Sequence, residues 1–132
     1  TDDRTPVTFI TRYYLDKIKR LCDAHGTKLL FVTAPSPVNH TMQRHNEVQA
    51  LADALAVPYL DLNLNTEELG IDWNLDTLDG GDHLNYTGCQ KATAYLQRYM
   101  QTHYTLPDRR DDVRYEAWNK QAEEFEKLLP QP

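Results

Sequence analysis

The feature that most constrains the fold is an unbroken apolar run, Leu29-Leu30-Phe31-Val32, in which no polar residue alternates with the apolar ones. A strand with one face in water alternates, whereas a strand covered on both faces, as in a parallel sheet, reads as a continuous apolar stretch. We therefore predict a strand from Lys28 to Thr33. The Ala-Pro-Ser-Pro sequence at 34–37 ends it, because proline cannot continue a hydrogen-bonded ladder.

Helical patterns precede and follow this strand. The first helix is predicted to end at Gly26, and the second to run from about Met42 to Ala56. Pro58 then opens a second short strand, Tyr59 to Leu62. The apolar stripes consist of Ile10, Tyr14, Ile18, Leu21 and Cys22 in the first helix and Val48, Leu51, Ala52 and Leu55 in the second. The order helix, strand, helix, strand is typical of an α/β fold with a parallel sheet, where functional groups collect at the carboxyl ends of the strands.

The rest of the chain is predicted to hold a long loop and two more helices. The segment from Asn63 to Leu84 is too long and polar for a plain connection, and such loops are usually functional or disordered. A third helix runs from Tyr86 towards His103. We assign residues 1–107 to the α/β part and 108–132 to a helical tail that packs on it, with partner binding as the alternative for the tail. The tail has an aromatic-rich stripe of Tyr115, Trp118, Ala122, Phe125 and Leu129.

Composition bounds the size and the partners. The chain has 132 residues, 40% of them hydrophobic, which suits one domain with a modest core. Its net charge of −6 argues against nucleic-acid binding, which needs clustered Lys and Arg. There is neither a run of 18 apolar residues nor a signal-like segment, so we expect no membrane-spanning segment and no export signal within this sequence.

No metal or cofactor is predicted. The stretch Asp72-Trp73-Asn74-Leu75-Asp76 has the alternating oxygen ligands that open a calcium loop, but Thr77 stands where that loop needs glycine and His83 where it needs glutamate. The three histidines His40, His45 and His83 show no zinc-ligand spacing. Cys22 and Cys89 fall on apolar helix positions, so we expect two buried small hydrophobic side chains and not a disulfide or ligands.

The strongest functional signal is the stretch from Asp76 to Gly88, which places carboxylates, a histidine and two glycines directly before a helix. A histidine acts as general base only if a partner fixes its tautomer and stabilises its imidazolium. Gly80 and Gly81 let the backbone fold so that Asp79 reaches the His83 ring, whereas the adjacent Asp82 tends to point away, towards solvent or the helix amino terminus. The alternative is a polar loop whose acidic residues complement the dipole of a helix capped by Asn85.

The motif His83-Leu84-Asn85-x-x-Gly88 with a preceding aspartate resembles the last conserved block of the SGNH (GDSL-like) esterases and acyltransferases. The similarity extends over roughly residues 8–120 and includes a membrane-anchored, DltD-like subgroup of Gram-positive bacteria. The chain resembles this subgroup in the order of Thr33-Ala34-Pro35-Ser36-Pro37, His45-Asn46, Tyr59-Leu60-Asp61-Leu62-Asn63, Gly70-Ile71-Asp72-Trp73 and the His83 block. It implies the carboxy-terminal portion of a three-layer α/β/α (flavodoxin-like) parallel sheet. The family spacing is Asp-x-x-His, whereas here Gly80 lies three residues before His83, so Asp79 and Asp82 both remain candidates for the orienting acid.

The resemblance implies that this is the C-terminal part of a serine esterase or O-acyltransferase acting on acyl esters of a cell-envelope glycan or polymer. The chain would supply His83 and its aspartate, and the missing N-terminal half of the domain would supply the nucleophilic serine and the oxyanion donors. A membrane anchor in that missing part would hold the domain outside the cytoplasm. Ser36 lacks the neighbouring glycines and donor pair of a nucleophile and reads as a loop residue. Trp73, Asn74 and Tyr86 are candidates for the substrate pocket. The alternative function is a non-catalytic fragment or interaction module.

Overall fold

The computed structural model describes residues 2–129, which fall into two compact units that meet between Gln97 and Arg98. The first unit contains a small parallel sheet with helices, and the second contains helical segments only. The packing of residues 108–132 on the α/β part stays a prediction.

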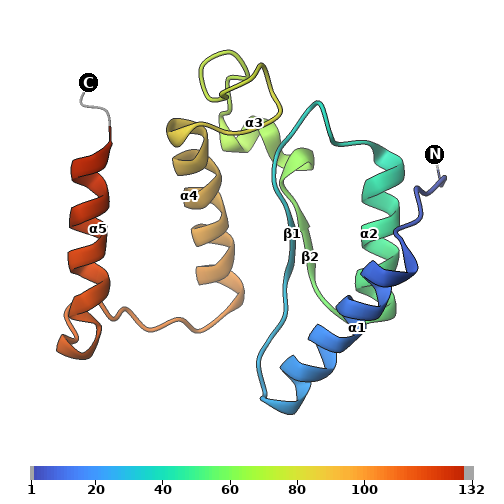
Figure 1. Ribbon diagram of the computed structural model, residues 1–132, viewed down its shortest axis with the longest axis horizontal. Coiled ribbons are helices and arrows are strands. Elements are labelled where there is room, and N and C mark those ends of the chain that lie inside the picture. Colours follow the sequence, from blue (N-terminus) through green and yellow to red (C-terminus); the bar gives the residue numbers. More distant parts are fainter. Residues whose placement is uncertain (1, 130–132) are drawn as a thin grey trace. The chain divides into compact units, whose positions relative to one another are not determined.

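The sheet of the first unit pairs β1 (Phe31–Thr33) with β2 (Tyr59–Asp61) in parallel, with Val32 opposite Leu60. Parallel strands require a crossover connection, and α2 (Met42–Ala54) provides it. The predicted order of helix, strand, helix and strand is therefore confirmed as a small α/β arrangement (Figure 1).

The two helices of this arrangement have side-chain caps at their amino ends. The Thr8 hydroxyl accepts a hydrogen bond from the Thr11 amide before α1 (Phe9–Ala24), and Thr41 does the same for Arg44 before α2. Such caps satisfy amide groups that have no partner inside the helix. α1 ends where predicted, with Gly26 at a φ of 63°, a left-handed conformation that glycine adopts without strain.

α1 and α2 lie next to each other (Figure 1), joined by an ion pair between Arg12 and the buried Glu47. The buried apolar residues that form the core lie in α2, in β2 and in the segments before and after β2. They are Leu51, Ala52, Val57, Leu60, Leu62 and Leu69.

The prediction that the first strand is covered on both faces is wrong for the described residues. Val32 is 41% exposed, and Leu29 and Leu30 lie before the strand and are only half-buried. No residue of α1 is buried either, so its apolar stripe faces solvent. The apolar pattern thus calls for packing partners that the described part of the first unit does not provide.

The segment from Asn63 to Leu84 is more ordered than the predicted loop. Strand β2 leads into a 3₁₀ turn, η1 (Leu62–Asn65), and a four-residue helix, α3 (Thr66–Leu69). Further on, Thr77 and Leu84 form an antiparallel bridge that closes the intervening residues into a loop.

The loop is fastened to α4 (Tyr86–His103), which spans the predicted residues. The Asn85 side chain caps this helix by accepting a hydrogen bond from the Gly88 amide at 3.1 Å. The buried Asp76 carboxylate accepts hydrogen bonds from Thr87 at 2.9 Å and Lys91 at 2.5 Å. One prediction fails here: Cys89 is exposed, since the buried residue of α4 is the neighbouring Gly88, and Cys22 is only half-buried.

The second unit continues α4 into a charged connection, a 3₁₀ turn η2 (Val113–Tyr115) and α5 (Glu116–Leu128). Trp118 and Phe125 on the predicted stripe of α5 are largely exposed. Among the helices of residues 2–129, none combines the length and apolarity needed to cross a bilayer.

Gly88 lies where α4 packs closely against the backbone of Asp76. A β-carbon there would overlap the Asp76 carbonyl oxygen and crowd Leu84 at 3.1 Å. We expect Gly88→Ala to lower the free energy of unfolding by about 1–3 kcal/mol through overpacking, despite the better helix propensity of alanine. Urea denaturation measures this, and Cys89→Ala, at the exposed next position, should change stability little. An unchanged or raised stability of Gly88→Ala would contradict the packing described for Asp76.

Candidate functional site

The predicted contact between Asp79 and His83 is present. Asp79 Oδ2 lies 2.6 Å from His83 Nδ1, and Asp79 Oδ1 accepts hydrogen bonds from the backbone amides of Asp82 at 3.0 Å and His83 at 2.8 Å. Gly80 and Gly81 have φ angles of 71° and 114°, which bring the chain back over Asp79 as the sequence predicted. Because the carboxylate accepts, Nδ1 carries the proton and Nε2 is left as the basic nitrogen.

Both partners of this pair have shifted pKa values. The hydrogen bond from His83, followed by those of the backbone amides, lowers the pKa of Asp79, so the carboxylate stays ionised. The hydrogen bond to Asp79, together with the charges of Asp82 and Asp79, raises the pKa of His83. This is the direction needed for a base that must hold a proton during a reaction. The His83 side chain is 70% exposed, so the ring is accessible to a reacting group.

Asp82 differs from its prediction. It does not point away from the ring, since its Oδ2 lies 3.4 Å from His83 Nδ1, and its Oδ1 accepts a hydrogen bond from Asn39. The reason is that Asn39 lies on the neighbouring loop and holds the Asp82 carboxylate close to the ring. Asp79 makes the shorter contact and remains the better candidate for the orienting acid.

The His83 loop packs on the loop that follows β1. A β-carbon at Gly81 would stand 2.9 Å from the Pro37 ring, and Ser36 Oγ donates a hydrogen bond to the Gly81 carbonyl at 3.4 Å. Ser36 Oγ also accepts from the Asn39 amide at 3.1 Å. These contacts place the His83 loop at the carboxyl end of β1, where parallel α/β sheets collect functional groups.

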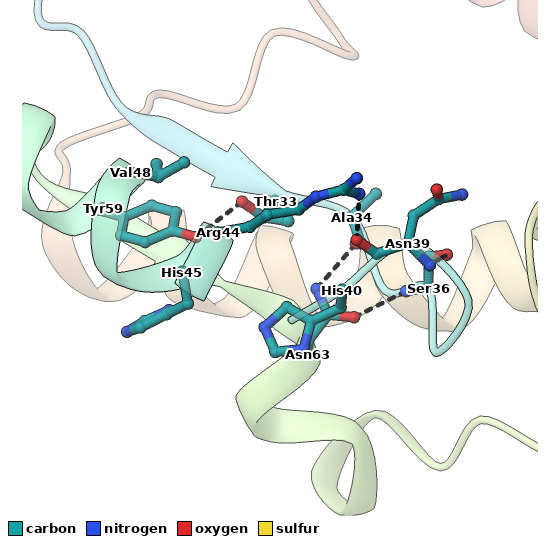
Figure 2. Close-up of a pocket in the computed structure, with 10 residues that line it drawn as sticks. All are labelled: Thr33, Ala34, Ser36, Asn39, His40, Arg44, His45, Val48, Tyr59 and Asn63. Carbon is teal, nitrogen blue, oxygen red and sulfur yellow. Dashed lines mark hydrogen bonds between the residues drawn. The ribbon is translucent and has the colours of Figure 1, made fainter. Parts of the chain in front are cut away.

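A cavity of about 280 Å³ lies at the same strand ends. Figure 2 shows its walls: the Tyr59 hydroxyl bonds to Thr33, and Asn63 bridges the Ala34 carbonyl and the Ser36 amide. The remaining lining residues are Asn39, His40, Arg44, His45 and Val48.

Behind the cavity lies Asp61, whose side chain is 1% exposed. Its Oδ1 accepts hydrogen bonds from the amide and side chain of Asn63, both at 2.9 Å. Its Oδ2 faces His45 Nδ1 at 2.7 Å, His40 Nε2 at 3.1 Å and the Tyr59 hydroxyl at 3.1 Å. The carboxylate thus joins the β1–α2 loop, α2 and β2 at one point.

Burial affects the pKa values of both Asp61 and Tyr59. Burial by itself raises the pKa of Asp61, but the hydrogen bonds from Asn63 and His45 outweigh it, so the pKa lies below its ordinary value. Burial, with the charge of Asp61 beside it, raises the pKa of Tyr59 to about 12. The cluster therefore holds an ionised carboxylate next to a neutral phenol at neutral pH.

The other predicted site residues lie elsewhere. Trp73 is half-buried, with its carbonyl accepting a hydrogen bond from Thr77, while Asn74 is exposed and Tyr86 is 41% exposed. None of the three lines the cavity at the strand ends. Their role in substrate binding stays a prediction.

Sequence reasoning missed the cluster of His40, His45 and Asp61. The spacing of His40, His45 and His83 does not match that of zinc ligands, whereas the structure brings the first two together with a carboxylate far from them in the chain. The available signal was Asp61 itself, an acidic residue at the end of an apolar strand that follows the helix of His45.

Comparison with models of protein families, with curated proteins and with solved structures finds no match to the chain.

The pairing of His83 can be tested by its titration. Asp79→Asn should lower the pKa of His83, because it removes the largest cause of the raised value, and Asp82→Asn should lower it less. NMR titration of the imidazole C–H signals measures both. A larger fall in the Asp82→Asn chain would show that Asp82 is the main partner.

The pKa of Asp61 predicts a contribution to acid unfolding. Since the folded value lies below the ordinary 3.8, the ionised group stabilises the fold above that pH, and this stability is lost as the pH falls through the folded value. We expect the free energy of unfolding to decline less steeply in Asp61→Asn than in the unaltered chain between about pH 5 and pH 1. Asp53→Asn, at an exposed position of α2, is the matched control for the loss of one carboxylate.

Proposed function

We propose that the chain is the carboxy-terminal half of an SGNH-type serine esterase or O-acyltransferase, with His83 as general base and Asp79 as its orienting acid. The single observation that supports this best is the 2.6 Å contact between Asp79 Oδ2 and His83 Nδ1 on an exposed loop at the strand ends. The family resemblance of the sequence motif points to His83 and to a nearby aspartate, either Asp79 or Asp82.

The chemistry follows from which ring nitrogen is left accessible. With Nδ1 bonded to Asp79, Nε2 of His83 takes the proton from a serine hydroxyl as that oxygen attacks the acyl carbon. The Asp79 carboxylate stabilises the imidazolium, which then returns its proton to the leaving group or acceptor. Asp79 is in turn held by two backbone amides, so the carboxylate is oriented before any substrate arrives.

The nucleophile belongs, in this proposal, to a preceding half of the domain. The Ser36 hydroxyl donates to the Gly81 carbonyl and accepts from the Asn39 amide, which suits a loop-stabilising role. The exposed stripe of α1 and the exposed Val32 of β1 are surfaces that further strands and helices would cover. The completed fold would then be a three-layer α/β/α domain.

The substrate proposed from the resemblance is an acyl ester of a cell-envelope glycan or polymer, acted on outside the cytoplasm by a membrane-anchored protein. The net charge of −6 is compatible with a neutral or cationic partner.

The experiment uses a longer protein whose reading frame places a Gly-x-Ser-like block upstream of this chain. His83→Ala should lower its rate of aryl-acetate hydrolysis by roughly three or more orders of magnitude, because the members of a triad act as a unit. Asp79→Asn should cost more activity than Asp82→Asn. The 132-residue chain alone should show no turnover.

Two results would contradict the proposal. Near-normal activity of the His83→Ala protein would remove the triad assignment. Turnover by the chain alone that Ser36→Ala abolishes would move the nucleophile into this sequence. The absence of an upstream serine block would favour the alternative function, a non-catalytic interaction module.

A further inference from the structure

We infer that His40, His45 and Asp61 form a binding site for a divalent transition-metal ion of the zinc class, with an open coordination position facing the cavity at the strand ends. The ligand atoms are His40 Nε2, His45 Nδ1 and one Asp61 oxygen, which all lie within 4.8 Å of one another. This site is independent of the role proposed for His83.

The number of donors around one oxygen points to an ion. Asp61 Oδ2 faces two imidazole nitrogens and the Tyr59 hydroxyl, three partners in all. A carboxylate oxygen offers about two lone-pair sites, so three donors are more than it accommodates well. If a cation lies between Oδ2 and the two imidazole rings, each ring coordinates it through the lone pair of an unprotonated nitrogen. Oδ2 then has two partners, the ion and the Tyr59 hydroxyl.

The distances suit zinc after a small adjustment. With bond lengths of about 2.0–2.1 Å, the ligand atoms of a tetrahedral zinc ion lie roughly 3.3 Å apart. Asp61 Oδ2 is 3.1 Å from His40 Nε2 and 2.7 Å from His45 Nδ1. The rings would move outward by roughly 0.2 and 0.6 Å to reach that separation.

The surroundings also resemble those of metal ligands. Asn63 binds the second Asp61 oxygen through two N–H groups, which fixes the direction of the carboxylate. The two histidine side chains are 18% and 14% exposed, so the ligands are shielded from solvent but accessible from the cavity. Three protein ligands with a fourth position open to a cavity are the arrangement of zinc sites that bind water or a small ligand.

The ligand types decide the class of ion. Two imidazole nitrogens and one carboxylate suit zinc and related transition metals, whereas calcium and magnesium take oxygen ligands. The cluster of Asp79, Asp82 and His83 has two carboxylates and one histidine that is 70% exposed. It could also bind a metal ion, so the experiment must distinguish binding there from binding at the first cluster.

The test is zinc binding to the metal-stripped, full 132-residue chain, followed by competition with a chromophoric chelator. We expect one zinc ion per chain, and a visible spectrum typical of tetrahedral Co²⁺ when cobalt replaces zinc. His45→Ala and His40→Ala should each weaken zinc binding by about 100-fold or more, and Tyr59→Phe, which alters only a group that contacts the ligand, by about 10-fold. His25→Ala, a histidine remote from both clusters, is the matched control.

NMR of the unaltered chain tests the site even if a variant fails to fold. Zinc should shift the imidazole NMR signals of His40 and His45 and leave those of His83 in place. The inference is overturned if the chain binds no zinc, if zinc shifts only the His83 signals, or if His83→Ala abolishes binding while His45→Ala does not.

Discussion

One buried carboxylate, that of Asp61, connects three segments of the first unit. Asp61 is the last residue of β2. Its carboxylate accepts hydrogen bonds from Asn63 in the turn after the strand, from His45 of α2 and from His40 of the β1–α2 loop. An ionised group this deeply buried is stable only when its lone pairs are satisfied, so these segments are held in one arrangement. Four residues that line the cavity at the strand ends, His40, His45, Tyr59 and Asn63, contact this carboxylate.

The His83 loop uses the same principle at the surface. Asp79 accepts hydrogen bonds from two amides and a ring nitrogen, and two glycines in left-handed conformations make that possible. The difference is exposure: Asp61 is enclosed, whereas His83 is open to a reacting partner. The loop contacts the β1–α2 loop through Asn39, so the two clusters share one edge of the sheet. An acyl-transfer base and a metal site side by side would give this edge two distinct chemistries.

The exposed apolar residues have a consistent physical explanation. α1 has an apolar stripe and no buried residue, and the unbroken apolar run at 29–32 leads into β1, where Val32 is partly in solvent. Apolar surface of this kind costs free energy in water unless another element covers it. Both patterns are compatible with the proposal that the chain is one half of a larger α/β domain.

Local patterns in the sequence determined the elements of this protein. Apolar spacing predicted α2 nearly to its ends, Gly26 marked the end of α1, and the Asn85 cap marked the start of α4. The two glycines before Asp82 predicted the Asp79–His83 contact, because it depends on residues a few positions apart. Tertiary structure alone decided the rest. It brought Asp61 to His40 and His45, drew Asp82 towards the ring through Asn39, and left Cys89 exposed. The contacts of Asp61 and Asn39 join segments distant in the chain. Their geometry follows from how β1, β2 and α2 pack, and the spacing of residues in the sequence does not encode that packing.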